Sequence, residues 1–485
     1  MDYTNYGENR WELCCGEYSG VEKEAIDRLY GLVQSYVPYI LTLRMMSGKI
    51  LLDSHNKNRV VVGTLQSNPL LKELADNGFY KPELCAEGYS IKTAPDPENK
   101  ALDITVLQGA DPSGVLYAVA DYERYAIRNR ETYHGYHYNK KYLPFVDRAL
   151  SFERCSAPKI EHRGLWSWGH VIYDYMKYID HMCECKLNTL ILWNDYIPVN
   201  AADIVCYAHA HAVKVIWGFS WCWGEKVNPT DPEDLNKCTR FVLDTYENQY
   251  RTVGCDGIYF QAFTETTDTK IDGESISDLV IRWVKYISDR LYERYPDIWI
   301  QFGLHATSIR EECSKFSAID SRMSIVWEDA GEFPYAYDPA KNQDFNKTLH
   351  YTKELLCLRG QQERFGAVFK GFTVLNWDRF EHQKGSHIVG KASRPFMESR
   401  TREKDFYWRY AAPYWIQQAP ELQRLLQAIA AAPINDRLIT ALVEDGMWES
   451  KLHISVQILA ELLWNPDTDL TELIKVLFHD CRDCL

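Results

Sequence analysis

The sequence of 485 residues predicts a (β/α)8 TIM barrel with a weakly marked last strand, preceded by a small α/β domain and followed by a helical region. From His162 onward, short apolar runs alternate with helical segments, an order that requires parallel pairing of the strands. Several runs end in an aromatic residue and then in polar residues, as in Thr189–Asp195 and Ser324–Asp329. Closure into a barrel is the commonest arrangement for about 250 residues of this kind.

Residues 1–155 are predicted to form the separate α/β domain. A helix is expected over residues 21–36, and a second helix should begin at Asp111 with Pro112 in its first turn. The expected strands of this domain are residues 49–53, 59–63, 88–93 and 102–107. No catalytic triad or phosphate-binding loop appears among these residues, so we expect a structural domain that packs on the barrel.

Residues 156–400 are predicted to form the barrel. The expected strands are residues 163–168, 189–193, 213–219, 257–263, 299–304, 324–327 and 371–376. Residues 386–390 are the weak candidate for the eighth strand. A helix over residues 276–291 keeps one apolar face until Pro296, and Asp231 precedes Pro232 as a helix cap.

Residues 401–485 are predicted to be helical throughout. The expected helices cover residues 405–418, 422–431, 436–445, 449–463 and 467–478. An aromatic stripe at helical spacing is expected to be core rather than a ligand contact, and it consists of Phe406, Tyr407, Tyr410, Tyr414 and Trp415.

The overall composition excludes several classes of partner. A formal net charge of −14, with no concentrated Lys/Arg segment, argues against nucleic-acid binding. The sequence shows neither a secretory leader nor a bilayer-spanning run, so we expect a cytoplasmic protein that does not enter a membrane. The 14 cysteines are scattered as reduced thiols would be. The isolated pair Cys481 and Cys484 lacks a second pair at zinc spacing, so we expect no metal and no cofactor.

The residues that follow the predicted strands indicate a carbohydrate ligand. In a parallel barrel the carboxyl ends of the strands form the mouth. Tryptophan near most of these ends favours a polyhydroxylated ligand, because sugar C–H faces stack on indole rings while hydroxyls bond to carboxylates and amides. The candidate substrate-binding residues are Arg163, Trp168, Trp193, Asp195, Trp223, Thr264, His305, Trp327, Trp377 and Asp378. We expect a small carbohydrate as partner and leave a homodimer open.

Acidic residues at the same ends fit the cleavage of a glycosidic bond, which needs one carboxylic acid and a second carboxylate. Glu265 is the candidate general acid, since it follows an almost wholly apolar strand whose surroundings would raise its pKa. Its alternative role is that of an ion-pair partner for an arginine. Glu328 is placed ahead of Asp329 as the second carboxylate, and Asp195 and Asp378 are further alternatives.

Short motifs in all three regions resemble a group of glycoside hydrolases. Residues 61–64, 87–93 and 109–117 are similar to the small domain that precedes the barrel in family 20 β-hexosaminidases and family 67 α-glucuronidases. Residues 162–164 resemble the start of their barrel, and residues 464–467 resemble a helical-domain motif of related N-acetylglucosaminidases. The resemblance implies an exo-acting hydrolase with its acid after the fourth strand, where Glu265 stands.

One position departs from the family 20 pattern. Those enzymes carry an aspartate directly before the catalytic glutamate to orient the substrate acetamide, and this chain has Thr264 there. Either Asp268, Glu328 or another acid orients the acetamide, or two carboxylates act directly. The leading hypothesis is hydrolysis of a β-N-acetylhexosaminide or a related sugar. The alternatives are a non-catalytic carbohydrate-binding barrel, an α-glucuronidase-like inverting hydrolase, and a metal-dependent isomerase or deacetylase, for which only His305 is well placed.

Overall fold

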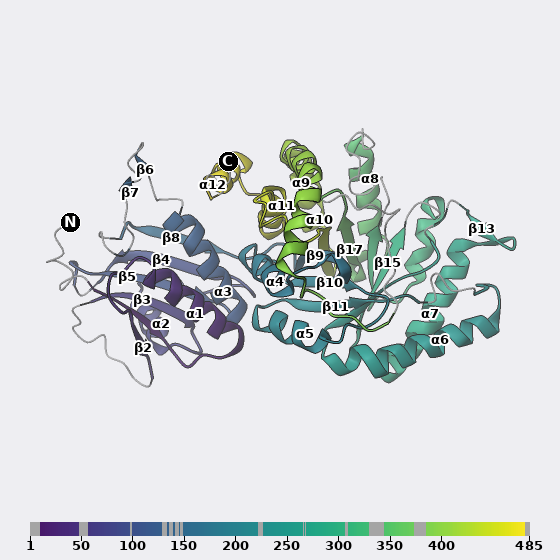
Figure 1. The fold of residues 1–485 in the computed structure, drawn as a ribbon, viewed down its shortest axis with the longest axis horizontal. Helices are drawn as coiled ribbons and strands as arrows, with labels where there is room; N and C mark the ends of the chain where they lie inside the picture. Colours follow the sequence, from purple (N-terminus) through teal and green to yellow (C-terminus); the bar gives the residue numbers. More distant parts are fainter. Residues whose placement is uncertain are drawn as a thin grey trace.

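The protein consists of a sheet domain followed by a closed barrel, which lie side by side in Figure 1. The computed structural model describes residues 10–47, 57–97, 99–128, 133–134, 139–140, 145, 149–221, 227–264, 266, 268–305, 309–328, 344–372 and 385–480. Among these residues, none of the helices combines the length and the apolar character needed to cross a bilayer.

The first domain is built on a six-stranded sheet of order β2-β1-β3-β5-β4-β8. Strands β2, β1, β3 and β5 pair in parallel, whereas β4 and β8 join antiparallel at one side. The strands are β1 (Trp11–Cys15), β2 (Thr42–Met45), β3 (Asn58–Thr64), β4 (Tyr89–Pro95), β5 (Asp103–Gly109) and β8 (Phe152–Ser156). The helices are α1 (Gly20–Gln34), α2 (Pro69–Asp76) and α3 (Pro112–Asp121).

Most of the expected elements of this domain occur, and their ends follow from local chemistry. The side chain of Asp111 caps α3 by accepting a hydrogen bond from Gly114 N, with Pro112 in the first turn as predicted. The parallel strands β1 and β2 were not predicted. The expected strand at residues 49–53 lies outside the described residues. A two-stranded hairpin, β6 (Tyr133–His134) with β7 (Asn139–Lys140), stands apart from the sheet.

The second part is a closed parallel barrel of order β10-β11-β12-β15-β16-β17-β18-β9, as predicted. Its strands are β9 (His162–Trp168), β10 (Thr189–Trp193), β11 (Lys214–Gly218), β12 (Gly257–Gln261), β15 (Trp299–His305), β16 (Ser324–Glu328), β17 (Arg364–Phe369) and β18 (Asp436–Leu442). A short hairpin, β13 (Lys270–Ile271) with β14 (Glu274–Ser275), follows β12.

Helices surround this barrel (Figure 1). They are α4 (Tyr175–Glu184), α5 (Ala201–Ala210), α6 (Pro232–Thr245), α7 (Ile276–Arg294), α8 (Phe345–Leu356), α9 (Arg394–Gln417), α10 (Ala419–Ala431), α11 (Ile454–Trp464) and α12 (Leu470–Asp480). The predicted cap at the start of α6 is confirmed, because the side chain of Asp231 accepts a hydrogen bond from Glu233 N.

The last two strands of the barrel correct the sequence prediction. The seventh strand is β17, which ends before the predicted residues 371–376, and the eighth is β18, in a segment predicted to be helical. Residues 386–390 form no strand. Strand β18 pairs in parallel with both β17 and β9, and six of its seven residues are buried. A strand buried on both faces has no alternating pattern, so its apolar run was mistaken for a helix face. The proposed domain limit at residue 400 therefore cuts through the barrel.

Two apolar layers hold the barrel together. Alternate side chains point inward, where Trp166, Ile191, Ile216 and Tyr259 form one buried cluster. Their sequence neighbours point outward and pack with the surrounding helices in a much larger cluster. Successive residues of a strand point to opposite sides, so the odd or even position of a residue (its parity) decides whether it faces the barrel interior or the helices.

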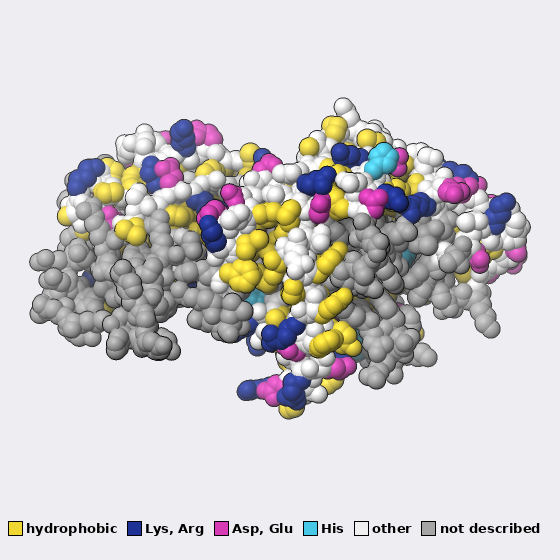
Figure 2. Space-filling view, turned by 90° about the horizontal axis from the view of Figure 1, so that it is seen from above, with side chains coloured by type: hydrophobic (Ala, Val, Ile, Leu, Met, Phe, Trp, Pro, Cys, Tyr) yellow, Lys and Arg dark blue, Asp and Glu magenta, His cyan; other side chains and the backbone are white. Residues whose placement is uncertain are grey.

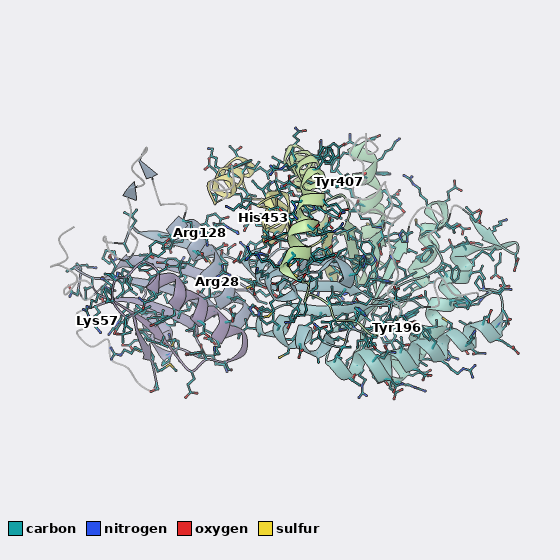
Figure 3. The ribbon with its side chains drawn as sticks, in the orientation of Figure 1. Arg28, Lys57, Arg128, Tyr196, Tyr407 and His453 are labelled. Carbon is teal, nitrogen blue, oxygen red and sulfur yellow. The ribbon has the colours of Figure 1, made fainter. Side chains whose placement is uncertain are left out.

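A fully buried charge network joins the first domain, the barrel and α11. The ammonium group of Lys186, in the loop before β10, donates to Asp121 Oδ1 at 2.6 Å and to Glu461 Oε1 at 2.7 Å. Arg124 also donates to Glu461 Oε1, at 2.6 Å. Although burial raises it, the charges of Lys186 and Arg154 hold the pKa of Asp121 below its ordinary value. Arg28, which is labelled in Figure 3, adds more exposed ion pairs across the same junction, to Glu123 and Glu184.

Helix α9 divides its aromatic residues between core and surface. Trp408 and Trp415 are buried, and Trp415 stacks on Phe372 with ring centroids 3.9 Å apart. Phe406 and Tyr410 are instead exposed, at 73% and 56%. Figure 2, which looks onto the face where α9 to α12 lie, shows hydrophobic side chains gathered near its centre. The expectation that the whole stripe is core is therefore wrong for its outward members.

The cysteines that the structure describes are free thiols.

We predict that Lys186→Met strongly destabilises the protein. The substitution leaves the carboxylates of Asp121 and Glu461 buried without their shared cation, which should cost about 3–5 kcal/mol of unfolding free energy. Urea unfolding followed by circular dichroism measures this cost. The matched control is Lys475→Met, since Lys475 lies on α12 with 64% of its side chain exposed and should change stability by less than about 1 kcal/mol. A cost for Lys186→Met as small as that of the control would contradict this role.

Candidate active site

Four polar side chains meet at the carboxyl end of the barrel, from four consecutive strands. Gln261 ends β12, His305 ends β15, Glu328 ends β16, and Lys370 directly follows β17. His305 and Glu328 are direct neighbours in the register of β15 and β16. Each of the four lies an even number of residues from an inward-facing residue of its strand, so its side chain also points inward. Together they form the layer of the barrel interior nearest the carboxyl ends of the strands.

Glu328 is the centre of this group. Gln261 Nε2 donates to Glu328 Oε1 at 2.7 Å, and Lys370 Nζ lies 3.2 Å from Glu328 Oε2. His305 Nε2 is 4.0 Å from the same Oε2 atom. Only glycine fits at Gly303 on the next strand, because a Cβ there would lie 2.6 Å from Glu328 Oε1 and 2.0 Å from the hydroxyl of Tyr259. The carboxylate is thus held in one orientation.

Burial controls the protonation of this group. It raises the pKa of Glu328 above its ordinary value, and the adjacent Lys370 opposes part of that rise. Burial, together with the charge of Lys370, lowers the pKa of His305 to about 3. His305 is therefore a neutral imidazole at neutral pH, able to donate one hydrogen bond and accept another.

Several buried polar atoms around the group have no hydrogen-bond partner within the described part of the chain. They are His305 Nδ1, the hydroxyl of Tyr259 and both amide atoms of Gln301. Buried polar groups in folded proteins are nearly always bonded to protein, to water or to a ligand. The barrel interior beneath its mouth therefore offers donors and acceptors that water or a hydroxylated ligand can satisfy.

Two of the predicted tryptophans form a wall beside these polar groups. Trp168 and Trp193 are direct neighbours in the register of β9 and β10 and share the inward cluster. Trp168 meets Trp166 edge-on at 4.5 Å, and Trp193 meets Tyr259 edge-on at 6.1 Å. Asp195, just beyond β10, is partly buried. The structure thus places Trp168 and Trp193 next to each other at the carboxyl ends of their strands, as expected.

Thr264, the residue before the candidate acid, is fully buried beyond the end of β12. Its hydroxyl oxygen accepts a hydrogen bond from His305 N at 3.4 Å, which ties this loop to β15. Asp268, one of the acids considered for orienting an acetamide, is exposed.

Two predicted substrate-binding residues are placed elsewhere. Arg163 lies at the amino end of β9, opposite the mouth, where its guanidinium bonds to Glu87 Oε2 at 2.7 Å and to three backbone carbonyls. Trp327 points outward and belongs to the cluster between barrel and helices. Both corrections have one cause: strand position and parity were not known when these residues were chosen. Their placement indicates structural roles.

Part of the predicted site lies outside the described residues. These residues are Trp223, Glu265, Asp329, Trp377 and Asp378.

Acidic residues after β18 were not predicted for the site, and their contacts explain what they do. Glu444 Oε1 accepts from Trp408 Nε1 at 3.2 Å, and Arg400 lies 3.3 Å from Glu444 Oε2. Asp445 accepts from the backbone N–H groups of Tyr173 and Asp174. Burial raises the pKa of Asp445 to about 6. These acids anchor α9 and the loop after β9.

Sequence reasoning missed Gln261, Lys370 and Tyr259. Gln261 points inward like Tyr259, two residues before it, on a strand described from the sequence as almost wholly apolar. The polar residue at the end of this strand was a usable signal. Lys370 directly follows the apolar run Phe365–Phe369. It would have been found had that run, instead of residues 371–376, been taken as the seventh strand.

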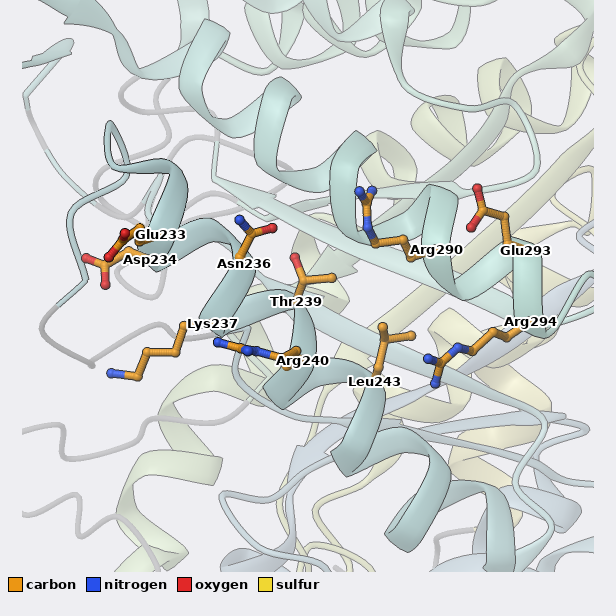
Figure 4. Close-up of a pocket in the computed structure, with 10 residues that line it drawn as sticks. All are labelled: Glu233, Asp234, Asn236, Lys237, Thr239, Arg240, Leu243, Arg290, Glu293 and Arg294. Carbon is orange, nitrogen blue, oxygen red and sulfur yellow. The ribbon is translucent and has the colours of Figure 1, made fainter.

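A separate crevice of about 760 Å³ lies on the outer wall of the barrel. Figure 4 shows its side chains coming from two neighbouring helices, α6 and α7. The lining carries both signs of charge on each helix, with Glu233 and Arg240 on α6 and Glu293 and Arg294 on α7. It is remote from the strand ends, so it does not belong to the candidate active site.

No family model and no curated protein matches the sequence. Solved structures do match the chain. A β-N-acetylhexosaminidase from Bacteroides fragilis NCTC 9343 has a TM-score of 0.52 and 13% identity, covering 98% of this chain and 91% of that one. A family 20 exo-β-N-acetylglucosaminidase from Vibrio harveyi has a TM-score of 0.51 and 10% identity, covering 98% and 74%.

A family 138 glycoside hydrolase that targets the pectin rhamnogalacturonan II also matches, with a TM-score of 0.51 and 13% identity. The match covers 96% of this chain and 52% of that enzyme, so the chain spans about half of its length. At these identities the likeness shows a shared fold, a TIM barrel with a preceding domain.

We predict that His305 makes the protein less stable in acid. Its folded pKa of about 3 lies below the ordinary 6.5, so between these values the unfolded chain binds a proton that the folded chain does not. The stabilisation is complete above pH 6.5 and is lost as pH falls, by about 2 kcal/mol between pH 7 and pH 5. Between pH 7 and pH 5, the free energy of unfolding of His305→Asn, measured with urea, should fall by about 2 kcal/mol less than that of the unmodified protein. The control is His350→Asn on α8, where the His350 side chain is 78% exposed, and equal pH dependence of the two variants contradicts the prediction.

Proposed function

We propose that this protein is an exo-acting glycoside hydrolase on a β-N-acetylhexosaminide or a related sugar, with Glu265 as general acid/base and Glu328 as the second carboxylate. The observation that carries the proposal is the buried carboxylate of Glu328, fixed between Gln261 and Lys370 at the carboxyl end of the barrel. Gln261 ends the strand that leads to Glu265, and β15 alone separates that strand from β16, so the chain path supports placing the two acids at the same end of the barrel.

The chemistry of glycoside hydrolysis accounts for the surroundings of Glu328. A second carboxylate must be ionised and held toward the anomeric centre or toward a water molecule. Lys370 favours the ionised form against burial, and the hydrogen bond from Gln261 restricts the side chain to one orientation. A fixed negative charge of this kind stabilises positive charge that develops on the sugar ring in the transition state.

The other groups at the mouth support a sugar as the substrate. Trp168 and Trp193 supply indole surface beside the polar cluster, and sugar C–H faces stack on such surface. Neutral His305 and the hydroxyl of Tyr259 can bond to sugar hydroxyls. The solved structures named as a β-N-acetylhexosaminidase and as an exo-β-N-acetylglucosaminidase share this fold, which supports the choice of sugar.

Two mechanisms remain candidates within this proposal. In one, Glu328 acts directly as nucleophile or as base for water. In the other, Glu328 orients a substrate acetamide that attacks the anomeric carbon, a role that exposed Asp268 is poorly placed to fill. A panel of nitrophenyl glycosides, including N-acetylhexosaminides and uronides, identifies the sugar. NMR of the first-formed anomer then distinguishes retention from inversion.

We predict that Glu265→Gln and Glu328→Gln each lower kcat by about 10²–10⁴-fold, with sugar binding retained. The amide keeps the shape of each side chain and removes its ability to exchange a proton or carry charge. Initial rates on the best nitrophenyl glycoside measure the effect, and ligand-observed NMR measures binding. The control is Glu153→Gln, an exposed acid on β8 that should leave kcat unchanged. Full activity in both active-site variants contradicts the assignment.

We predict that Lys370→Met moves the acidic limb of the kcat/KM profile to higher pH, by about one to three units. The lysine favours ionised Glu328, so its loss lets burial raise the pKa of that carboxyl further. The measurement is kcat/KM from pH 4 to pH 9. Lys347→Met, which removes a lysine that is 77% exposed on α8, should leave the profile in place. A lower kcat with an unmoved acidic limb would show that Glu328 does not govern that limb.

A further inference from the structure

A crevice of about 610 Å³ opens in the first domain, at the carboxyl end of its parallel strands. Its lining comes from the ends of β3 and β5 with the segments that follow them, from residues 82–84 before β4, and from Glu22 in the first turn of α1, which follows β1. The volume falls within the range of small-molecule sites in proteins. This domain has no part in the chemistry proposed for the barrel.

The topology of the sheet marks this end as a ligand position. Strand β1 continues through α1 to β2 on one side, whereas the neighbouring β3 continues through α2 toward β4 on the other. Adjacent strands whose connections leave in opposite directions create a crevice outside their carboxyl ends, where open α/β sheets bind ligands. Helices α1 and α3 pack on one face of the sheet and α2 on the other. The helices therefore leave this end of the sheet uncovered.

The local structure keeps the walls of the crevice close together. A Cβ on Gly16 would lie 1.6 Å from Ser67 O, so the loop after β3 crosses directly over the end of β1. Gly63 has φ of +139°, and a Cβ there would lie 2.9 Å from both Glu22 Oε1 and Ser67 Oγ. Ser67 Oγ donates to Glu22, which fixes that carboxylate within the lining.

One atom of a buried side chain in the lining, Gln108 Oε1, has no hydrogen-bond partner within the described residues. Gln108 is 2% exposed, and its Nε2 donates to Pro82 O at 3.1 Å. Its Oε1 accepts no hydrogen bond within the described part of the chain. A buried acceptor left open at the side of a crevice is costly unless a donor reaches it. A hydroxyl or an N–H group of a ligand could donate the hydrogen bond that Gln108 Oε1 lacks.

The charge of the lining restricts the ligand further. Carboxylates are contributed by Glu22, Glu83 and Asp111, and the described lining contains no Lys, Arg or His. A phosphate or a carboxylate would meet only like charge there. Leu65 and Leu84 add apolar surface against which the C–H face of a sugar ring can pack. The set of acceptors fits a ligand that donates hydrogen bonds and carries no negative charge.

We propose that this crevice is a second, non-catalytic binding site for a neutral or amino sugar of one or two rings. Hydroxyl or ammonium groups of the sugar donate to Gln108 Oε1 and to the neighbouring carboxylates, while its C–H face packs on Leu65 and Leu84. Binding here is independent of hydrolysis in the barrel, so the site holds sugar whether or not the barrel turns it over.

Titration calorimetry of the full chain with glucosamine and N-acetylglucosamine tests the site, with glucuronate as the anionic comparison. Ala110 is exposed on the crevice lining, so Ala110→Trp fills the space, and Ala101→Trp places the same ring on an exposed turn outside it. We expect Ala110→Trp to weaken sugar binding to this domain at least tenfold and to leave turnover of nitrophenyl glycosides within twofold. Ala101→Trp should change neither.

A second variant keeps the test decisive should Ala110→Trp fail to fold. Glu83 is exposed, so Glu83→Lys preserves the fold and replaces an acceptor by a cation, which should weaken glucosamine more than N-acetylglucosamine. The proposal is overturned if neither variant changes sugar binding, or if glucuronate binds the crevice as tightly as glucosamine. Loss of crevice binding with normal turnover supports it. Loss of turnover in Glu265→Gln with crevice binding intact separates it from the function proposed for the barrel.

Discussion

Closure of the barrel by β18 is the constraint on which the rest of the molecule depends. This strand must lie between β17 and β9, so the chain returns from α9 and α10 to pair residues 436–442 with both neighbours. The return places α11 beside the start of the barrel, where Glu461 accepts a hydrogen bond from Lys186, which also donates to Asp121. The first domain, the barrel and the last helices are therefore joined by one buried charge network, which forms only when the barrel is closed.

Closure also builds the candidate site. The register of parallel strands brings Gln261, His305, Glu328 and Lys370 to one level of the barrel interior, although more than 100 residues of chain separate the first from the last. In that buried setting a lysine and a glutamine hold a carboxylate, and a histidine stays neutral. Burial sets the pKa directions, and the neighbouring charges decide how far each moves.

Features that depend on short sequence patterns were predicted correctly from the sequence. The caps Asp111 and Asp231, the parallel barrel and the gathering of Trp168 and Trp193 near the strand ends all follow from patterns in the sequence. The closing strand did not follow, because its two buried faces remove the alternation that identifies strands. Arg163 and Trp327 were assigned to the mouth because the direction of a side chain depends on strand ends and parity, which were known only approximately.

The sequence by itself determined the class of fold, six of the eight barrel strands and the residue types available at their ends, since periodicity, caps and composition are local properties. The tertiary structure decided which strand closes the barrel, which acid is buried beside a lysine, and which sheet end is left open. Those outcomes depend on pairing between distant segments. The direction of each side chain and the register of its strand then decide that Trp327 packs in the core, that Arg163 has a structural role and that Glu328 is an oriented carboxylate.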